Sequence, residues 1–273
     1  MDKIADILKR HGFGFDKRLG QNFLTDSNLL AAIADDAGVT ADDTVLEIGA
    51  GAGTLTRALA DRAKRVVALE VDEHLRPVLA ETLADKGNAE VVFKDFRSVG
   101  DDELRALVGD AFKVVANLPY YITTPIVMRF VEGDVRPVSM SVMVQKEVAD
   151  RLAAAPGTAD YGAITASVAL CCDVRITRFV PRSLFTPPPN VDSSVVRLDF
   201  VDKLPREEEQ KTRRLIGAAF AMRRKTLVNN LARCGYAKEA VAAALEKMGL
   251  RADVRGETLS YLDFAKLQKL LSV

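Results

Sequence analysis

The sequence has few of the residues that build disulfide frameworks or zinc sites. Only three cysteines and two histidines occur among its 273 residues. Cys171 and Cys172 are adjacent, so on a strand they would point to opposite faces, and Cys234 stands alone. We interpret all three as reduced, small, buried apolar residues. His11 and His74 lack metal-ligand spacing, so the sequence predicts no metal site.

Long apolar runs are also missing. No stretch of about 18 apolar residues is present, so no membrane-spanning helix is expected. At the N-terminus, Ile4, Ile7 and Leu8 alternate with charged residues, unlike the continuous apolar core of a signal peptide. Acidic residues there argue against a transit peptide. These features predict a cytoplasmic protein, and the length suits one large domain plus a small one.

The formal net charge is zero, since 38 basic residues balance 38 acidic ones. The distribution is uneven, however, with 15 basic and 9 acidic residues in 201–273. The stretch Lys211–Arg233 holds seven basic residues and no acidic one. Phosphate binding needs such a local cluster, so we predict RNA contact centred on Arg223, Arg224 and Lys225. A solvated helix face is the alternative.

Short apolar strand patterns alternate with helical patterns through the first 200 residues. This alternation predicts an α/β domain with a mostly parallel sheet. The expected strands are 44–48, 65–71, 89–93, 112–116 and 138–144, followed by 164–172, 175–180 and 194–200. The last three have little helix between them and predict an antiparallel finish. The expected helices are 54–63, 73–84, 102–108 and 125–131, the last with Thr124 as N-cap.

The pattern changes near residue 202. A polar linker at 202–209 is followed by four helical patterns and no strand pattern. The expected helices are 208–221, 224–234, 238–248 and 259–271. Gly235 and Gly249 stand where helix C-caps belong. We therefore predict a large domain at 1–201 and a small all-helical, RNA-binding domain at 202–273.

A glycine-rich loop follows the first strand of the α/β domain. Glycine lets the backbone turn sharply and approach a ligand closely. The spacing E-x-G-x-G-x-G, from Glu47 to Gly53, is typical of methyltransferases, whereas Thr54 occupies the third glycine position of a dinucleotide fingerprint. Glu70 and Asp95 end the next two strands, where ligands of such sheets bind. We expect Glu70 to accept from ribose hydroxyls and Asp95 from an adenine amine.

The fourth strand ends in Asn117-Leu118-Pro119-Tyr120. Methyl transfer to an exocyclic amine requires the nitrogen lone pair to face the methyl donor. The Asn117 side-chain oxygen and the Leu118 carbonyl are predicted to hold the two N–H groups. Pro119 fixes the backbone, and Tyr120 is expected to stack on the base.

A proline-rich loop at 184–191 begins near Phe185. A base removed from its stack needs aromatic neighbours on both faces. Phe185 is a candidate for the face opposite Tyr120. The alternative is an ordinary core phenylalanine next to a stiff loop.

Segments spread over nearly the whole chain resemble the bacterial ribosomal RNA small-subunit adenine dimethyltransferase family (KsgA/RsmA). They are KRLGQNFL (17–24), EIGAGAGTLT (47–56), ALEVD (68–72), NLPYYITTP (117–125), QKEVADRLAAAPGTADYG (145–162), FTPPPNVDSSVVRL (185–198), RRKTLVNNL (223–231) and RGETLS (255–260). The resemblance implies a Rossmann-like methyltransferase fold with a mostly parallel seven-stranded sheet. It also implies S-adenosyl-L-methionine as cofactor, and two adjacent adenosines near the 3′ end of small-subunit rRNA as substrates.

The same resemblance implies a set of cofactor-binding residues: Asn22, Leu24, Gly49, Gly51, Glu70, Asp95 and Asn117. The partner it implies is the small ribosomal subunit or its precursor, bound by a monomer. Ala50 and Tyr121 depart from the family pattern, which commonly has Pro and Asn there.

Two alternatives remain. The related erythromycin-resistance methyltransferases act on large-subunit rRNA and share the glycine loop. A ribosome-assembly or transcription factor that keeps the fold without the chemistry is the other, although the intact 117–120 motif argues against it. A dehydrogenase is disfavoured by Thr54 and by the lack of a hydride-transfer acid.

Overall fold

The computed structural model describes residues 4–15, 21–222 and 224–272, and the chain divides into two compact units. The first unit contains the residues up to 149 together with 175–200. The second contains 150–174 and the residues from 201 onward. The predicted boundary at 201 coincides with one crossing between the units, whereas no sequence signal marked the grouping of 150–174. The assignment of 1–201 and 202–273 as functional domains stays a prediction.

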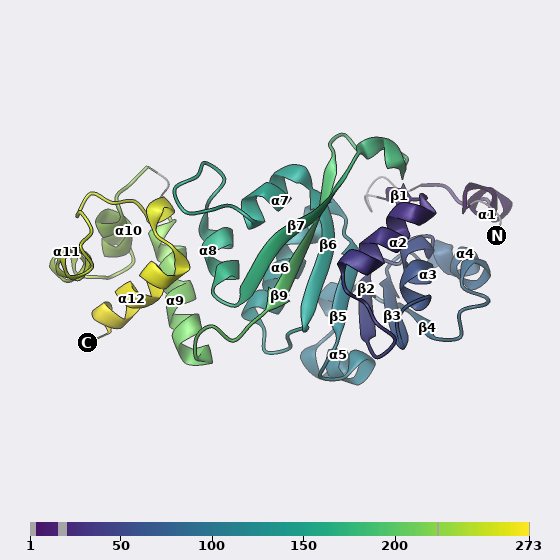
Figure 1. Ribbon diagram of the computed structural model, residues 1–273, viewed down its shortest axis with the longest axis horizontal. Coiled ribbons are helices and arrows are strands. Elements are labelled where there is room, and N and C mark those ends of the chain that lie inside the picture. The colour runs from purple at the N-terminus through teal and green to yellow at the C-terminus, as the bar shows by residue number, and fades with distance from the viewer. Residues whose placement is uncertain (1–3, 16–20, 223, 273) are drawn as a thin grey trace. The chain divides into compact units, whose positions relative to one another are not determined.

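A seven-stranded sheet has the order β4-β3-β2-β5-β6-β9-β7 (Figure 1). Its strands are β2 (Thr44–Ile48), β3 (Arg65–Glu70), β4 (Ala89–Phe93), β5 (Lys113–Asn117), β6 (Ser139–Gln145), β7 (Cys172–Val180) and β9 (Ser193–Phe200). Strands β2 to β6 pair in parallel, and β9 pairs antiparallel with β6. The predicted Rossmann-like sheet and its antiparallel finish are confirmed.

Four helices follow strands of the first unit as the sequence predicts: α3 (Thr54–Ala60), α4 (Arg76–Thr82), α5 (Asp101–Val108) and α6 (Thr123–Glu132). Helices α1 (Ile4–Arg10) and α2 (Ser27–Asp36) precede β2 and were not predicted, and α7 (Lys146–Leu152) leads into the second unit. Helix α6 begins earlier than expected, because its N-cap is Ile122 and not Thr124. Pro125 lies within the first turn, where its missing N–H costs no helical hydrogen bond.

Alternate residues of each parallel strand point to opposite faces, and both faces are covered by helices (Figure 1). On one face, α2 and α3 bury Leu30 and Leu59 in a cluster that contains Val115 of β5. On the other, Phe130 of α6 packs on Phe112 with 6.2 Å between ring centroids. The central strands β2 and β5 are thereby mostly buried between helices.

A two-stranded antiparallel sheet lies beside the glycine loop. It pairs β1 (Phe23–Leu24) with β8 (Phe185–Thr186), so that Leu24 faces Phe185. The pairing joins the N-terminal segment to the proline-rich loop, although more than 150 residues separate them in the sequence.

No helix among the described residues is long and apolar enough to cross a membrane.

The second unit is helical, as predicted for the C-terminal region. Its helices include α8 (Ala163–Ala169), α9 (Arg206–Ala219), α10 (Leu227–Arg233), α11 (Lys238–Lys247) and α12 (Tyr261–Leu271). Gly235 and Gly249 follow α10 and α11 with φ of 96° and 72°, which confirms them as helix-ending residues. One core unites these helices and includes Ala166, Leu215 and Phe264.

The predicted strand at 164–172 is wrong, because 163–169 form α8 and β7 begins only at Cys172. Packing favours the helix, since Ala166 joins the core of the second unit and the Thr165 hydroxyl donates to the Arg151 carbonyl at 2.6 Å. Cys171 and Cys172 therefore do not alternate on one strand, and their sulfur atoms lie 3.9 Å apart. Both are buried as expected, whereas Cys234 is exposed.

Candidate active site

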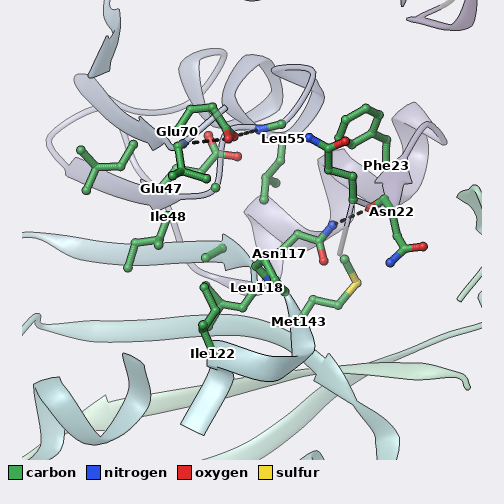
Figure 2. Close-up of a pocket in the computed structure, with 18 of the residues that line it drawn as sticks. Asn22, Phe23, Glu47, Ile48, Leu55, Glu70, Asn117, Leu118, Ile122 and Met143 are labelled. Atoms are coloured by element: carbon green, nitrogen blue, oxygen red, sulfur yellow. Dashed lines mark hydrogen bonds between the residues drawn. The ribbon is translucent and has the colours of Figure 1, made fainter. Parts of the chain in front are cut away.

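A cavity of about 150 Å³ opens at the carboxyl ends of β2, β3 and β5 (Figure 2). The cofactor and catalytic residues predicted from the sequence all line it, and all lie in the first unit. They are Asn22, Leu24, Gly49, Gly51, Glu70, Asp95, Asn117, Leu118, Pro119, Tyr120 and Phe185. Parallel strands bring their ends to one edge, which is why residues so distant in sequence meet here.

The glycine loop is clamped to the neighbouring strand. The N–H groups of Gly49 and Ala50 donate to the Leu69 carbonyl at 2.8 and 3.0 Å. Gly49, Gly51 and Gly53 all have positive φ, which other residues rarely adopt. At Gly51 a Cβ atom would also lie 3.1 Å from the Phe23 ring. The loop backbone thus passes close to the cavity because no side chain stands between them.

Glu70 is buried at the end of β3 and holds this loop in place. Its Oε2 accepts from the Gly51 N–H at 2.7 Å, and its Oε1 accepts from the N–H groups of Val71 and Asp72 at 2.8 and 2.9 Å (Figure 2). Burial raises the pKa of Glu70, and these N–H donors partly offset the effect. The carboxylate lies at the cavity wall where the ribose acceptor was predicted, and its loop-holding bonds were not predicted.

Glu47 lies on β2 immediately before the loop and is 1% exposed. Its Oε2 has no hydrogen-bond partner among the described residues. Burial raises the pKa of Glu47 well above its usual range; the Thr56 hydroxyl partly offsets this, and the charge of Glu70 adds to it. The sequence indicated Glu47 only as part of the loop motif, because no pattern distinguishes a cavity-facing acid from the rest of the strand.

Asp95 lies at the cavity rim and is engaged by Arg97. The Arg97 N–H donates to Oδ1 at 2.9 Å, and its guanidinium donates to Oδ2 at 2.7 Å. The Arg97 hydrogen bonds lower the pKa of Asp95, so this carboxylate is charged at neutral pH. Any ligand amine that binds Asp95 must share the carboxylate with Arg97.

The N-terminal segment closes one side of the cavity through backbone contacts. The Asn22 carbonyl accepts from the Asn117 Nδ2 at 3.2 Å (Figure 2). The Leu24 carbonyl accepts from the Thr54 hydroxyl at 2.9 Å. Asn22 and Leu24 were implied only by resemblance, and the structure brings both to the cavity wall.

Asn117 ends β5 with its amide in a defined orientation. Because Nδ2 donates to the Asn22 carbonyl, Oδ1 of the same amide is available as an acceptor. Tyr120 follows in a short 3-10 turn and is anchored by its hydroxyl, which lies 2.9 Å from Oγ of the buried Ser193. Burial raises the pKa of Tyr120, so the phenol stays neutral. Ser193 was not among the predicted site residues, since its contact with the site exists only in the tertiary fold.

Phe185 has two roles in the structure. It is 4% exposed and belongs to the hydrophobic cluster that contains Leu24 and Leu30. It also lines the cavity on the side of β8. The two interpretations of this residue are therefore compatible, and its contact with a base stays a prediction.

Two residues of the basic run 211–233 already form ion pairs with acidic side chains of the same unit. Lys211 pairs with Glu207 at 2.5 Å, and Arg213 pairs with Glu209 at 2.8 Å. These acids lie one helical turn before the run, so a count of the run alone missed them. Arg224 and Lys225 are exposed and form no ion pair among the described residues, whereas Arg223 lies outside them.

The donors and acceptors of the cavity suit a positively charged nucleoside. Carboxylates predominate, and the two cationic side chains of the rim are already paired, Lys94 with Glu103 and Arg97 with Asp95. Nothing among these residues forms a phosphate cradle, and no metal-binding cluster occurs in the described part of the chain. S-adenosylmethionine offers hydroxyls and an amine to such acceptors and carries a sulfonium and an ammonium. Fold and cavity together define a Rossmann-like, S-adenosylmethionine-dependent methyltransferase.

Comparison with known proteins gives the family. A family model described as ribosomal RNA adenine dimethylase matches residues 12–272. Ribosomal RNA small subunit methyltransferase A of Clostridioides difficile is 44% identical over 283 residues, covering 100% of this chain and 98% of the relative. The protein of the same name from Geobacillus thermodenitrificans is 45% identical over 281 residues, covering 98% and 95%. The chain belongs to the ribosomal RNA adenine dimethylase family.

Two solved structures share the architecture. The 23S rRNA methyltransferase ErmE superposes with a TM-score of 0.73 at 30% identity, covering 92% of this chain and 100% of that one. A dimethyladenosine transferase from Plasmodium falciparum superposes with a TM-score of 0.73 at 28% identity, covering 90% and 95%. The predicted fold, enzyme class and cofactor are confirmed.

Proposed function

We propose that this enzyme dimethylates N6 of two adjacent adenosines near the 3′ end of small-subunit (16S) rRNA during ribosome biogenesis. The relatives named for the small subunit are 44% and 45% identical to the chain, whereas the 23S enzyme is 30% identical. The structural observation that carries the proposal is the Asn117 amide, oriented by the Asn22 carbonyl beside the cavity.

The target amine is held by two acceptors at the end of β5. The Asn117 Oδ1 and the Leu118 carbonyl each accept one N–H of the adenine amine, so that its lone pair points into the cavity. Pro119 keeps the two acceptors in register by fixing the backbone between them and Tyr120. S-adenosylmethionine supplies a methyl group on a positively charged sulfur. At each transfer the nitrogen would gain one N–C bond while the sulfur–methyl bond breaks, the neutral thioether leaves, and the nitrogen releases one proton to solvent.

The flipped base lies between aromatic rings in this proposal. Tyr120 provides one face with its ring, and its hydroxyl lies 2.9 Å from Oγ of Ser193. Phe185 provides the other face from β8, where pairing with Leu24 fixes its backbone. Base–aromatic stacking contributes on the order of 1–3 kcal/mol per base.

Cofactor binding follows the order of the strands. We assign Glu70 to the ribose hydroxyls and Asp95 to the adenine amine, with Gly49 and Gly51 allowing close approach. Asn22, Leu24 and Asn117 complete the contact set on the side of the N-terminal segment. The support is that all of these residues line one cavity.

RNA is held by the C-terminal region, 202–273, through Arg223, Arg224 and Lys225. The support is the exposure of Arg224 and Lys225 and the absence of an acidic partner for either in the described residues. We further propose that the enzyme acts as a monomer in the cytoplasm, on the small ribosomal subunit or its precursor.

The decisive experiment incubates the enzyme and S-adenosylmethionine with small subunits that lack this modification. Mass spectrometry of the digested rRNA is expected to show two adjacent N6,N6-dimethyladenosines near the 3′ end. Unmodified large-subunit rRNA in the same assay serves as the control for an erythromycin-resistance type of activity. Methylation of the large subunit alone would overturn the assignment.

A further inference from the structure

The connection between α9 and α10 carries two exposed basic residues, Arg224 and Lys225, which we assign to RNA contact. Both ends of this connection are fixed within the second unit. Ala219, the last residue of α9, is 2% exposed. At the start of α10, the Leu227 N–H donates to the Val254 carbonyl at 2.8 Å. The position of the two basic residues therefore depends on what holds the backbone between these ends.

Asn230 of α10 holds this backbone through its side-chain amide. It is 2% exposed, and its Nδ2 donates to the Ala219 carbonyl at 2.7 Å and to the Met222 carbonyl at 3.1 Å. The last carbonyls of a helix lack partners within it, so the bond to Ala219 satisfies one of them. Both N–H groups of the buried amide are thus used, whereas its Oδ1 has no partner among the described residues. The contact depends on the two donors.

The Met222 carbonyl also belongs to the turn that carries the basic residues. It accepts from the Lys225 N–H at 3.1 Å, and this bond closes a turn over 222–225. Arg224 lies within the turn, and Lys225 ends it. The Asn230 amide therefore ties the first carbonyl of this turn to α10.

We propose that Asn230 is a positioning residue that orders Arg224 and Lys225 for phosphate contact before RNA binds. The inference rests on the proposed RNA contact of these two residues. Without the amide, the turn loses its link to α10, and RNA binding must then also fix the backbone of the turn. Asn230 is buried and uncharged, so it contributes to affinity through the turn and not by touching RNA.

A double-mutant cycle on the full-length protein tests this. Asn230→Leu removes both N–H groups, keeps the size of the side chain and adds no charge. In filter binding to small subunits it is expected to weaken affinity by about tenfold, the cost of fixing roughly one further backbone residue on binding. In a protein that carries Arg224→Gln and Lys225→Gln, the same change is expected to weaken affinity by less than about twofold, because the cations that it positions are gone. An equal loss in both backgrounds overturns the inference, since Asn230 then acts through the stability of the whole unit.

Val241→Ala is the matched control for stability. Val241 lies on α11, is buried in the core of the same unit and has no hydrogen-bonding group in its side chain. The substitution is expected to lower the melting temperature and to leave small-subunit affinity unchanged. If it weakens binding as much as Asn230→Leu does, the inference is overturned.

Hydrogen exchange of the free wild-type protein needs no variant, so it decides the question even where Asn230→Leu fails to fold. The Lys225 amide is expected to exchange more slowly than in an unstructured peptide, because the Met222 carbonyl that accepts it is held by Asn230. Exchange at the unstructured rate overturns the inference.

These tests are separate from the test of the methylation itself. If Arg224→Gln with Lys225→Gln binds small subunits as the wild type does, the RNA contact and this inference are both wrong. Mass spectrometry of the rRNA still decides the proposed methylation in that case.

Discussion

Removal of the Asn117 side chain separates orientation of the target amine from every other contribution to catalysis. Asn117→Ala deletes one of two proposed acceptors and leaves the Leu118 carbonyl in place. The lost bond goes to a nitrogen that becomes positively charged, and such bonds contribute about 1.5–3 kcal/mol. At 1.36 kcal/mol per tenfold change, the single-turnover rate is expected to fall by about 10- to 150-fold.

The assay mixes excess enzyme and S-adenosylmethionine with unmodified small subunits and follows the first methyl transfer. Subunit binding is expected to stay near normal, because the contact acts mainly in the transition state. Asn117→Asp keeps an acceptor but loses the N–H that fixes it on the Asn22 carbonyl, so an intermediate loss is expected. Asn88→Ala is the control, since Asn88 also donates its amide to backbone carbonyls but lies outside the cavity. A near-normal rate for Asn117→Ala would refute the mechanism.

Three further predictions concern the cofactor, the base and the RNA. Glu70→Ala is expected to make the binding free energy of S-adenosylhomocysteine less favourable by on the order of 1–3 kcal/mol, because buried acceptors are lost. Calorimetry measures this change. Phe185→Leu keeps most of a buried side chain but removes the ring, so single-turnover rates are expected to fall by about 5- to 150-fold through lost stacking of about 1–3 kcal/mol. Charge reversal of Arg224 and Lys225 is expected to weaken small-subunit binding and lower its salt slope by about two in filter binding.

Each of these has its own control. Unchanged affinity in Glu70→Ala removes Glu70 from the cofactor site. Tyr120→Phe keeps a stacking ring and is expected to be mild in the rate assay, in contrast to Phe185→Leu. A near-normal rate for Phe185→Leu assigns Phe185 to the core alone. Lys211→Glu reverses one charge, as Lys225→Glu alone does, but Lys211 is already paired, so a smaller effect than that of Lys225→Glu is expected.

Local sequence patterns were sufficient for most elements of the first unit. The runs around β2 and β3 are short and apolar, and buried parallel strands require that composition. Glycine at 49, 51 and 53 predicts a loop with positive φ, because other residues rarely adopt it. Since parallel strands end at one edge, the sequence also predicted that Glu70, Asp95 and Asn117 would meet.

Local patterns failed where packing outweighs them. Residues 164–172 are apolar enough for a strand, yet 163–169 form α8 because the second unit buries Ala166 among its helices. The ion pairs of Lys211 and Arg213 were missed for a related reason, since their acids lie one turn earlier on α9.

The chain by itself thus determined which residues stand at the strand ends, because strand boundaries, glycine positions and side-chain types are local properties. Only the tertiary structure decided which hydrogen bonds and charge interactions those residues form with one another. The order β4-β3-β2 places three carboxylates in a row, and burial leaves Glu47 with a vacant oxygen beside Glu70. The Asn117 amide is oriented by a carbonyl 95 residues away. Charge state and orientation depend on neighbours from other elements, so they exist only once the strands have come together.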